Sequence, residues 1–323
     1  MAKTIEADVV LSCGEHLPAV DVWMVIDVLR ATTVIATWFE LGGGDLYPVS
    51  STTAARRLAR ELSEGGSAPL LMGEENAIPP QGFDLGNSPL DLNHELIKTH
   101  SCAVMATTNG TGALLDAAST GAPVVVACAR NATAALDHAL SLGSRIGILC
   151  AGRKRRPAWD DTLCAGLILD ELKKRAPGLL LADSARLALL SWQTCGGLHA
   201  SMATADHAVF LDKIGYGPDI AFACQQDAAS VAPVLHEEPE GDGMRAVLRN
   251  AAGSVRPTPS ALETLAPPPP PAPVSADRFA PLLQYTQDLP TTQEHPQYFF
   301  LGGEGRRRAE KKLNLTLKEG NHQ

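Results

Sequence analysis

The sequence lacks the features that would place it in a membrane, in a secretory route or on nucleic acid. No apolar run reaches the roughly 18 residues that are needed to span a bilayer. The amino terminus has no hydrophobic stretch followed by a small-residue cleavage site, so no signal peptide is visible. With 27 basic and 36 acidic residues, the chain carries a formal charge of −9. It therefore lacks the basic surface that a general nucleic-acid binder requires.

Several common sequence motifs are also absent. The seven cysteines form no C-x-x-C pair, and six of them lie in apolar stretches. We therefore expect reduced, mostly buried thiols in a cytoplasmic protein. No Walker A motif and no strand followed by G-x-G-x-x-G occurs, which argues against a P-loop NTPase and a dinucleotide dehydrogenase. Leu29 stands where a phosphatase of the haloacid dehalogenase type would carry a second aspartate.

The chain does contain a regular alternation of short apolar runs and helical patterns up to residue 235. Continuously apolar runs are typical of strands that are covered on both faces. We therefore predict an α/β fold with three layers, in which a largely parallel sheet carries helices on both faces. The predicted strands are Val22–Val28, Leu46–Val49, Leu70–Met72, Ala103–Ala106, Val124–Ala127 and Ile146–Cys150, and the predicted helices are Ala54–Leu62, Leu92–Ile97 and Ala134–Leu142.

The character of the chain changes near residue 236. Twelve of the 23 prolines follow, including the run Pro267–Pro271, and helical or strand periodicity is sparse. Consecutive prolines adopt polyproline II and do not pack as a helix or an interior strand. We therefore predict an α/β domain over residues 1–235 and a mostly disordered, proline-rich tail over residues 236–323.

Polar residues that suit a phosphate ester follow the first predicted strand. Asp27 ends an apolar run, Arg30 can bind a phosphate or sulfonate through two N–H groups, and Thr32 and Thr33 supply hydroxyls. Ligands of open α/β sheets bind at the carboxyl ends of the strands, so these groups are candidates for a site. A plain Asp–Arg pair with a threonine cap explains the segment as well.

Two further segments place polar groups at helix starts. In the segment GFDLGNSP, Asp84 offers oxygen ligands for Mg²⁺, while Asn87 and Ser88 stand at a helix entrance that can bind an anion. The alternative is a capped turn whose apolar side chain packs against the protein. The segment Thr107–Thr111 brings hydroxyls, an amide and a glycine to a strand-to-helix junction, which suits either a phosphate site or an ordinary cap.

The last predicted strand leads into a basic loop and an acidic pair. Gly152 is followed by four basic residues, Arg153 to Arg156, and Asp160 and Asp161 open the next helix. The two aspartates favour the helix dipole, and they also suit a metal ion or the role of general base. His138, His199 and His207 lie in helical regions without an i, i+4 partner, so we interpret them as structural.

Four segments together resemble the 2-phosphosulfolactate phosphatase family. They are DVLRATT at 27–33, GFDLGNSP at 82–89, TTNGT at 107–111 and CAGR…DDTLCAG at 150–166. The resemblance covers roughly residues 5–235, and the loop Lys154–Pro157 departs from the small, glycine-containing loop of that family. It implies a Mg²⁺-dependent hydrolysis of 2-phosphosulfolactate to 3-sulfolactate and phosphate, in a pathway that leads to coenzyme M.

The resemblance and the residues together predict a Mg²⁺-dependent phosphatase for a small anionic 2-phospho acid, with no nucleic-acid or membrane partner. A homo-oligomer is compatible with the sequence. We expect Arg30 and Arg153 to stabilise the transferring group, and Asp27, Asp84 and Asp161 to hold metal or activate water. The expected substrate-binding residues are Thr32, Thr33, Asn87, Ser88, Thr107, Thr108, Asn109, Gly110, Thr111 and Gly152.

Two alternatives remain open at this stage. Cys150 and Arg156 have the spacing of a cysteine-phosphatase loop, although Pro157 replaces the usual Ser or Thr after the arginine. The other alternative is a non-catalytic sensor that binds phospho acids and signals through the proline-rich tail. Three carboxylates favour the enzyme over the sensor, because pure anion binding gains nothing from them.

Overall fold

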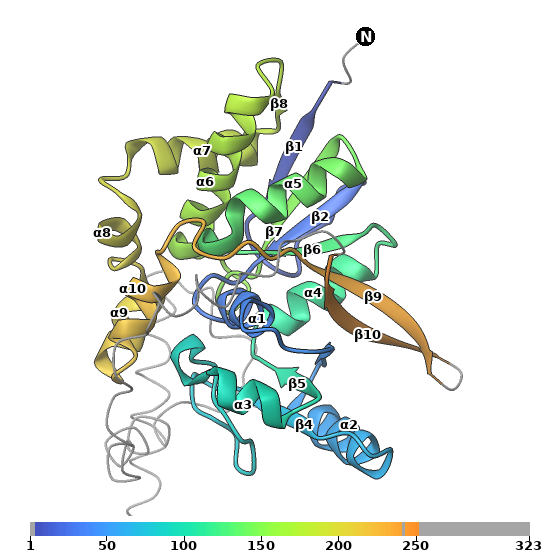
Figure 1. Cartoon of the computed structure of the whole chain (residues 1–323). Helices are drawn as coiled ribbons and strands as arrows, with labels where there is room; N and C mark the ends of the chain where they lie inside the picture. The colour runs from blue at the N-terminus through green and yellow to red at the C-terminus, as the bar shows by residue number, and fades with distance from the viewer. Residues whose placement is uncertain (1–3, 241–242, 252–323) are drawn as a thin grey trace, which may run out of the picture. The chain divides into compact units, whose positions relative to one another are not determined.

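The computed structural model describes residues 4–240 and 243–251, and this part of the chain folds around a ten-stranded sheet (Figure 1). The strand order is β4-β5-β3-β10-β9-β6-β2-β7-β1-β8. In chain order the strands are β1 (Glu6–Val10), β2 (Val22–Ile26), β3 (Leu46–Pro48), β4 (Pro69–Gly73), β5 (Cys102–Ala106), β6 (Val124–Ala127), β7 (Arg145–Cys150), β8 (Leu180–Leu181), β9 (Pro233–Glu240) and β10 (Gly243–Asn250).

Helices connect most of these strands and extend the fold beyond the sheet. They are α1 (Ala31–Glu40), α2 (Thr52–Glu64), α3 (His94–Thr99), α4 (Gly110–Ala118), α5 (Ala132–Leu142), α6 (Trp159–Arg175), α7 (Asp183–Thr194), α8 (Leu198–Met202), α9 (Asp206–Lys213) and α10 (Gly217–Ala223), with short 3₁₀ turns η1 (Pro89–Asp91) and η2 (Ala129–Asn131). None of the helices within the described ranges is both long and apolar enough to cross a membrane.

The sheet consists of two parallel blocks joined by an antiparallel hairpin. One block holds β4, β5 and β3, and the other holds β6, β2, β7, β1 and β8. The hairpin β9–β10 pairs with each block at its amino end, with Leu248 opposite Leu46 and Leu235 opposite Val124. The strands β3 and β6 therefore run away from the hairpin toward their carboxyl ends. Helix α1 lies between the two blocks in Figure 1.

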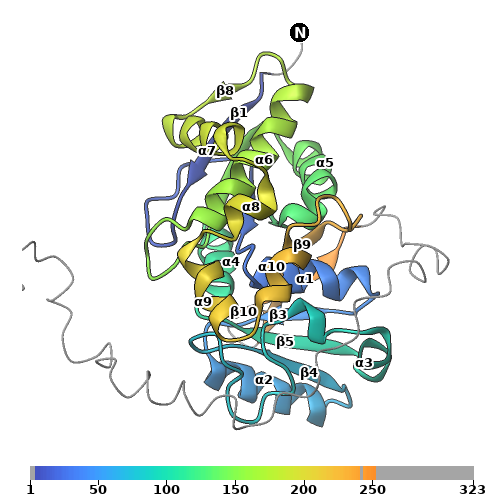
Figure 2. The same cartoon turned by 90° about the vertical axis from the view of Figure 1, so that its left-hand side faces the viewer.

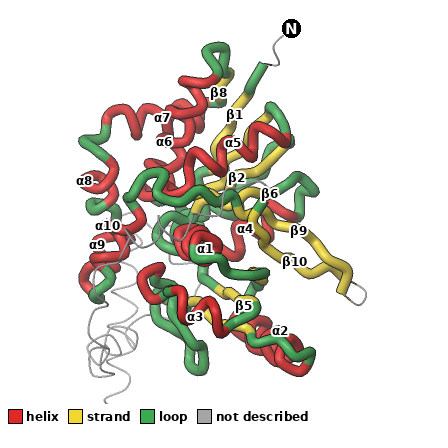
Figure 3. Tube along the Cα trace, in the orientation of Figure 1, coloured by secondary structure: helices red, strands yellow, loops and turns green. Residues whose placement is uncertain are grey.

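Strand β2 and helix α1 form the centre of the core. All five residues of β2 are fully buried, and alternate side chains of a strand point to opposite faces, so both faces of β2 are covered. Helix α1 is buried at every position, as expected of a largely apolar helix surrounded by protein. The predicted α/β class, with a largely parallel sheet and flanking helices, is confirmed (Figure 3).

The helix start signals of the sequence act as caps. The Ser51 hydroxyl accepts the N–H of Ala54 at 3.2 Å and opens α2. The Ser88 hydroxyl accepts the N–H of Leu90 at 3.3 Å, but Ser88 opens the turn η1 instead of the predicted helix. Asn93 caps α3, which therefore begins two residues later than predicted.

The predicted boundary at residue 235 is wrong for the residues that follow it directly. Strand β9 runs through the boundary, and β10 lies in the middle of the sheet with Val247 and Leu248 fully buried. Residues 236–250 are therefore part of the α/β fold, and the remaining stretch of the predicted tail, 252–323, lies outside the described residues. Strands β1 and β8, at one edge of the sheet, were not among the predicted strands.

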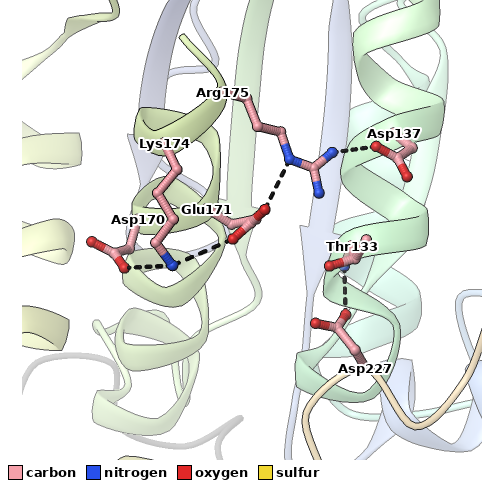
Figure 4. A network of polar contacts seen from close by, with 7 residues as sticks. All are labelled: Thr133, Asp137, Asp170, Glu171, Lys174, Arg175 and Asp227. Carbon is pink, nitrogen blue, oxygen red and sulfur yellow. Dashed lines mark hydrogen bonds and ion pairs between the residues drawn. The ribbon is translucent and has the colours of Figure 1, made fainter. Parts of the chain in front are cut away.

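A polar network ties α5 to α6 (Figure 4). Arg175, near the end of α6, donates to Asp137 of α5 and to Glu171, one turn earlier in its own helix. At the other end of α5, Asp227 accepts the backbone N–H of Thr133 at 2.7 Å. Asp227 lies near the end of the region, residues 5–235, that resembles the family. Its contact with Thr133 stabilises the start of α5.

Candidate active site

The carboxylate of Asp27 lies at the carboxyl end of β2, where α4 begins. Asp27 is 8% exposed, and a Cβ added to Gly110, the first residue of α4, would lie 2.6 Å from Asp27 Oδ2. Burial raises the pKa of Asp27 to about 6; the His207 charge opposes the shift, and the Glu74 and Asp160 charges add to it. The missing side chain at Gly110 thus lets a buried carboxylate approach a helix amino terminus.

Asp161 joins the two loops that leave β2 and β7. Its Oδ1 accepts the N–H of Val28 at 2.9 Å, and its Oδ2 accepts the N–H of Gly152 at 3.0 Å. Burial, together with the charges of Asp160 and Asp27, raises the pKa of Asp161 well above its ordinary value. Because both oxygens bind backbone N–H groups, Asp161 positions these loops.

Glu74 is a site residue that the sequence reasoning missed. It directly follows β4, and its two carboxylate oxygens accept the N–H groups of Thr108 at 2.7 Å and Ala77 at 2.6 Å. It therefore ties the loop after β4 to the loop after β5, and its charge raises the pKa of Asp27. Its position directly after a buried apolar strand, as for Asp27, was the available signal.

Arg30 is held in a buried polar cluster instead of lying free in solvent. Its guanidinium donates to Asp219 at 3.2 Å and to the carbonyl of Ala77 at 3.3 Å, and it stacks over the Tyr216 ring at 4.2 Å. Ser88 donates to the other oxygen of Asp219 at 2.7 Å. The structure thus brings Arg30 and Ser88, both predicted site residues, to one carboxylate that was not predicted.

The helices α8 to α10, here called the helical cap, contribute this carboxylate and two further contacts (Figure 2). His207 of α9 approaches Asp160 at 3.6 Å, and the Phe210 ring lies 5.1 Å from the Arg153 guanidinium. Together with Asp219 of α10, these residues contact the loop after β2 at Arg30, the loop after β7 at Arg153 and the first turn of α6 at Asp160. The cap therefore covers the same strand ends that the sequence motifs occupy.

The basic loop after β7 forms a tight two-residue turn. The backbones of Arg153 and Arg156 pair with each other, and the intervening Lys154 and Arg155 have φ values of 53° and 57°. Such left-handed conformations cost about 1–3 kcal/mol each for residues other than glycine. The Arg155 side chain lies over Gly14, where a Cβ would come within 2.4 Å of its guanidinium.

Asp84 does not join the other carboxylates. Its side chain is exposed, and its Oδ2 accepts the N–H of Leu71 at 2.8 Å. Leu71 belongs to β4, the outermost strand of its block, so Asp84 binds the free edge of the sheet. The structure therefore gives Asp84 an edge-pairing role, and its predicted part in holding metal or activating water has no support from its contacts.

The hydroxyls of the first motif shape its loop. Thr32 Oγ1 accepts the N–H of Asp27 at 3.1 Å, and Thr33 donates to the carbonyl of Val28 at 2.8 Å. Both threonines are fully buried. They were predicted to bind substrate, and the structure shows them holding the turn between β2 and α1.

The TTNGT segment is also largely self-contained. Thr107 and Thr111 exchange hydrogen bonds at 3.0–3.1 Å and so begin α4. Asn109 precedes that helix, and its side chain makes no capping hydrogen bond in the described structure. Asn87, from the second motif, is buried, and its Oδ1 has no hydrogen-bond partner among the described residues. Asn87 therefore retains an acceptor for a ligand, whereas the hydroxyls of Thr107 and Thr111 are engaged with each other's backbone.

Cys150 is unsuited to the role of a nucleophile. The residue ends β7, is fully buried, and is one of the seven free cysteines of the chain. Burial, followed by the charges of Asp161 and Asp160, raises the pKa of its thiol well above the ordinary value. A catalytic cysteine needs a lowered thiol pKa and access to substrate. The cysteine mechanism is therefore unsupported at this position.

The carboxylates of the site do not form a complete metal cage. Within residues 4–240 and 243–251, no three His, Cys, Asp or Glu side chains are placed to hold one ion. The predicted trio of Asp27, Asp84 and Asp161 is divided, because Asp84 lies at the sheet edge and Asp161 binds two backbone N–H groups. Asp27 remains as the carboxylate that can face a ligand.

Comparison with known proteins identifies the class. A family model described as 2-phosphosulpholactate phosphatase matches residues 12–238. A protein of Deinococcus radiodurans, described as a "probable 2-phosphosulfolactate phosphatase", is 36% identical over 239 residues, which cover 74% of this chain and 95% of that protein. A protein of Pseudothermotoga lettingae with the same description is 32% identical over 231 residues, or 71% and 96% of the two chains.

The fold, the site and these matches define a phosphoric monoester hydrolase. The chain belongs to the 2-phosphosulfolactate phosphatase family, because the family match spans well over half of its residues. All four sequence motifs lie within the matched region, and three of the four contribute to the cluster of loops around Asp27.

Proposed function

We propose that this chain hydrolyses a small 2-phospho acid, with 2-phosphosulfolactate as the favoured substrate, to the hydroxy acid and inorganic phosphate. The observation that carries the proposal is the buried Asp27 at the start of α4, together with the helical cap that contacts Arg30 and Arg153 on the loops after β2 and β7. The descriptions of the relatives name this substrate. By the family resemblance, the reaction then serves a route to coenzyme M.

The phosphoryl group would lie where the loops after β2 and β5 meet. Backbone N–H groups at the start of α4 favour a negatively charged group, and Gly110 permits a close approach. Arg30 is immobilised by Asp219 and Tyr216, so it requires little reorganisation when charge develops on the transferring group. Arg153, whose guanidinium lies over the Phe210 ring, supplies a second positive charge.

We further propose that Mg²⁺ is the cofactor and that Asp27 holds it. Asp27, Glu74 and Asp160 are buried carboxylates whose charges repel one another, and a cation at Asp27 offsets that repulsion. Mg²⁺ usually binds through one or two carboxylates, water and substrate phosphate, so an incomplete protein cage suits it. Bound Mg²⁺ polarises phosphoryl oxygens and lowers the pKa of a coordinated water.

Phosphate release from a panel of small phospho acids tests both proposals. We expect activity that EDTA abolishes and Mg²⁺ restores, with 2-phosphosulfolactate among the best substrates. Asp27→Asn should lower kcat by about 10²- to 10³-fold, a loss typical for removal of one charge-stabilising group. Asp84→Asn is the matched control, because its exposed side chain lies at the sheet edge, and it should keep the wild-type kcat.

Three results would each overturn one part of this proposal. Equal kcat values for the Asp27→Asn variant and the wild type would remove Asp27 from the site. Activity that is unchanged after exhaustive EDTA treatment would reject the proposed cofactor, and no phosphate release from any ester of the panel would reject the reaction.

A further inference from the structure

The helical cap brings one histidine to the candidate active site. His207 of α9 lies with its Nδ1 3.6 Å from Oδ2 of Asp160, in the first turn of α6. The His207 side chain is 19% exposed, whereas Asp160 is only 2% exposed. This arrangement pairs a solvent-reachable imidazole with a buried carboxylate.

Asp160 has little else to bind. In the part of the chain that the structure describes, its Oδ1 has no hydrogen-bond partner. Its neighbour Asp161 differs, because both of its oxygens accept backbone N–H groups. The carboxylate of Asp160 is therefore available to orient His207 through Nδ1, which leaves Nε2 of the ring for a second partner.

His207 lies close to the group around which the reaction is proposed to occur. When the ring is protonated, its charge acts on the Asp27 carboxylate, and its partner Asp160 is the direct neighbour of Asp161, which binds the loop after Asp27. The proposed phosphoryl site lies at the start of α4, beside Asp27. The proposed step requires that the oxygen linking the phosphate to the organic part of the substrate lies toward His207.

We propose that His207 is the general acid of the reaction and that Asp160 is its positioning residue. The proposal rests on the proposed phosphatase function. Phosphoryl transfer proceeds through a loose transition state, in which negative charge builds up on the leaving oxygen. The leaving group of a 2-phospho acid is a secondary alkoxide, a strong base, so a proton donor at this oxygen lowers the barrier.

The proposed step balances without a further reactant. Water adds to phosphorus, the bond from phosphorus to the ester oxygen breaks, and the proton on Nε2 of His207 moves to that oxygen. The products are the hydroxy acid and dihydrogen phosphate, and His207 is left neutral. The dihydrogen phosphate retains both protons of the water. Loss of one proton from the phosphate to solvent, and uptake of one by His207, restore the enzyme.

The test compares two esters that differ in the need for an acid. The substrates are 2-phosphosulfolactate, with its alkoxide leaving group, and para-nitrophenyl phosphate, whose phenolate leaves without protonation. Rates are measured with Mg²⁺ and with enzyme in excess, so that slow turnover is still recorded. The variants are His207→Gln and Asp160→Asn, and His199→Gln, an exposed histidine of α8 in the same cap, is the matched control.

For His207→Gln we expect the rate of hydrolysis of 2-phosphosulfolactate to fall by about 10²-fold or more, as for removal of a general acid. The rate with para-nitrophenyl phosphate should fall by less than about tenfold. Asp160→Asn should show the same selectivity with a smaller loss, and His199→Gln should match the wild type. Equal losses of His207→Gln on both esters, or no loss, would overturn the proposal. Wild-type protein inactive on both esters would instead count against the proposed function.

Discussion

Asp219 offers a direct test of whether burial or ion pairing dominates in the Arg30 cluster. Its side chain is 3% exposed and contacts a guanidinium at 3.2 Å and the Ser88 hydroxyl at 2.7 Å. Both partners favour the charged carboxylate. Burial opposes them and is the largest influence, so the pKa of Asp219 rises from 3.8 to about 6. Desolvation thus outweighs the ion pair at this position.

The sign of the pH effect follows from this shift. A carboxyl group whose pKa is raised by folding binds its proton more tightly in the native state, so its contribution to stability is complete below pH 3.8. This contribution is lost as pH rises from about 4 to about 6. A shift of about 2 units corresponds to about 3 kcal/mol, at 1.36 kcal/mol for each unit.

The measurement is the free energy of unfolding in urea from pH 4 to pH 7, for the wild type and for Asp219→Asn. The asparagine keeps the size of the side chain but does not titrate, so the variant should gain about 3 kcal/mol relative to the wild type over this range. Asp206→Asn, at an exposed site of the same cap, is the control and should show no such trend. A relative gain in the opposite direction would mean that Arg30 dominates, and the reasoning would be refuted.

Three other predictions concern neighbouring parts of the fold. Gly110→Ala places a Cβ 2.6 Å from Asp27 Oδ2, so it should lower kcat strongly and destabilise by about 1–3 kcal/mol, whereas Gly112→Ala, with open space around it, should do neither. Cys150→Ser should lower the melting temperature, because it buries a hydroxyl, and leave kcat nearly unchanged. A chain that lacks β10 and most of β9 should be insoluble, whereas one ending at Ala251 should melt cooperatively; equal solubility of the two would contradict the central place of the hairpin.

The position of Asp27 could be predicted because its signal is local. A carboxylate that ends a continuous apolar run must emerge at a strand end, and such ends are where ligands of α/β sheets bind. Glu74 carries the same signal after β4. Asp84 shows the limit of this reasoning, since a polar residue in a glycine-rich turn can face a ligand or a free sheet edge. The strand order decides between the two, and it cannot be read from periodicity.

His207 and Asp219 were beyond local reasoning for a different reason. Each lies in a short helix and has no polar partner at i+3 or i+4 that would mark a site. Their role depends on how the helical cap packs against α6 and η1, which brings them to residues far earlier in the chain. Their partners, Asp160 and Arg30, stood in motifs that the sequence did reveal. The motifs therefore located the site, and the tertiary fold completed it.

The hairpin β9–β10 explains why the site lies where it does. A sheet of uninterrupted parallel neighbours would place β3 directly beside β6 and leave no room for a buried helix between them. The hairpin separates these strands, pairing with each only at its amino end, and α1 fills the space that opens beyond. Asp27 and Arg30 lie in the loop that leads into this helix, so residues from both parallel blocks reach them: Gly110 and Ala77 from one, Asp161 through Val28 from the other. The hairpin β9–β10, which directly precedes the proline-rich stretch in the sequence, thus allows the two halves of the site to meet.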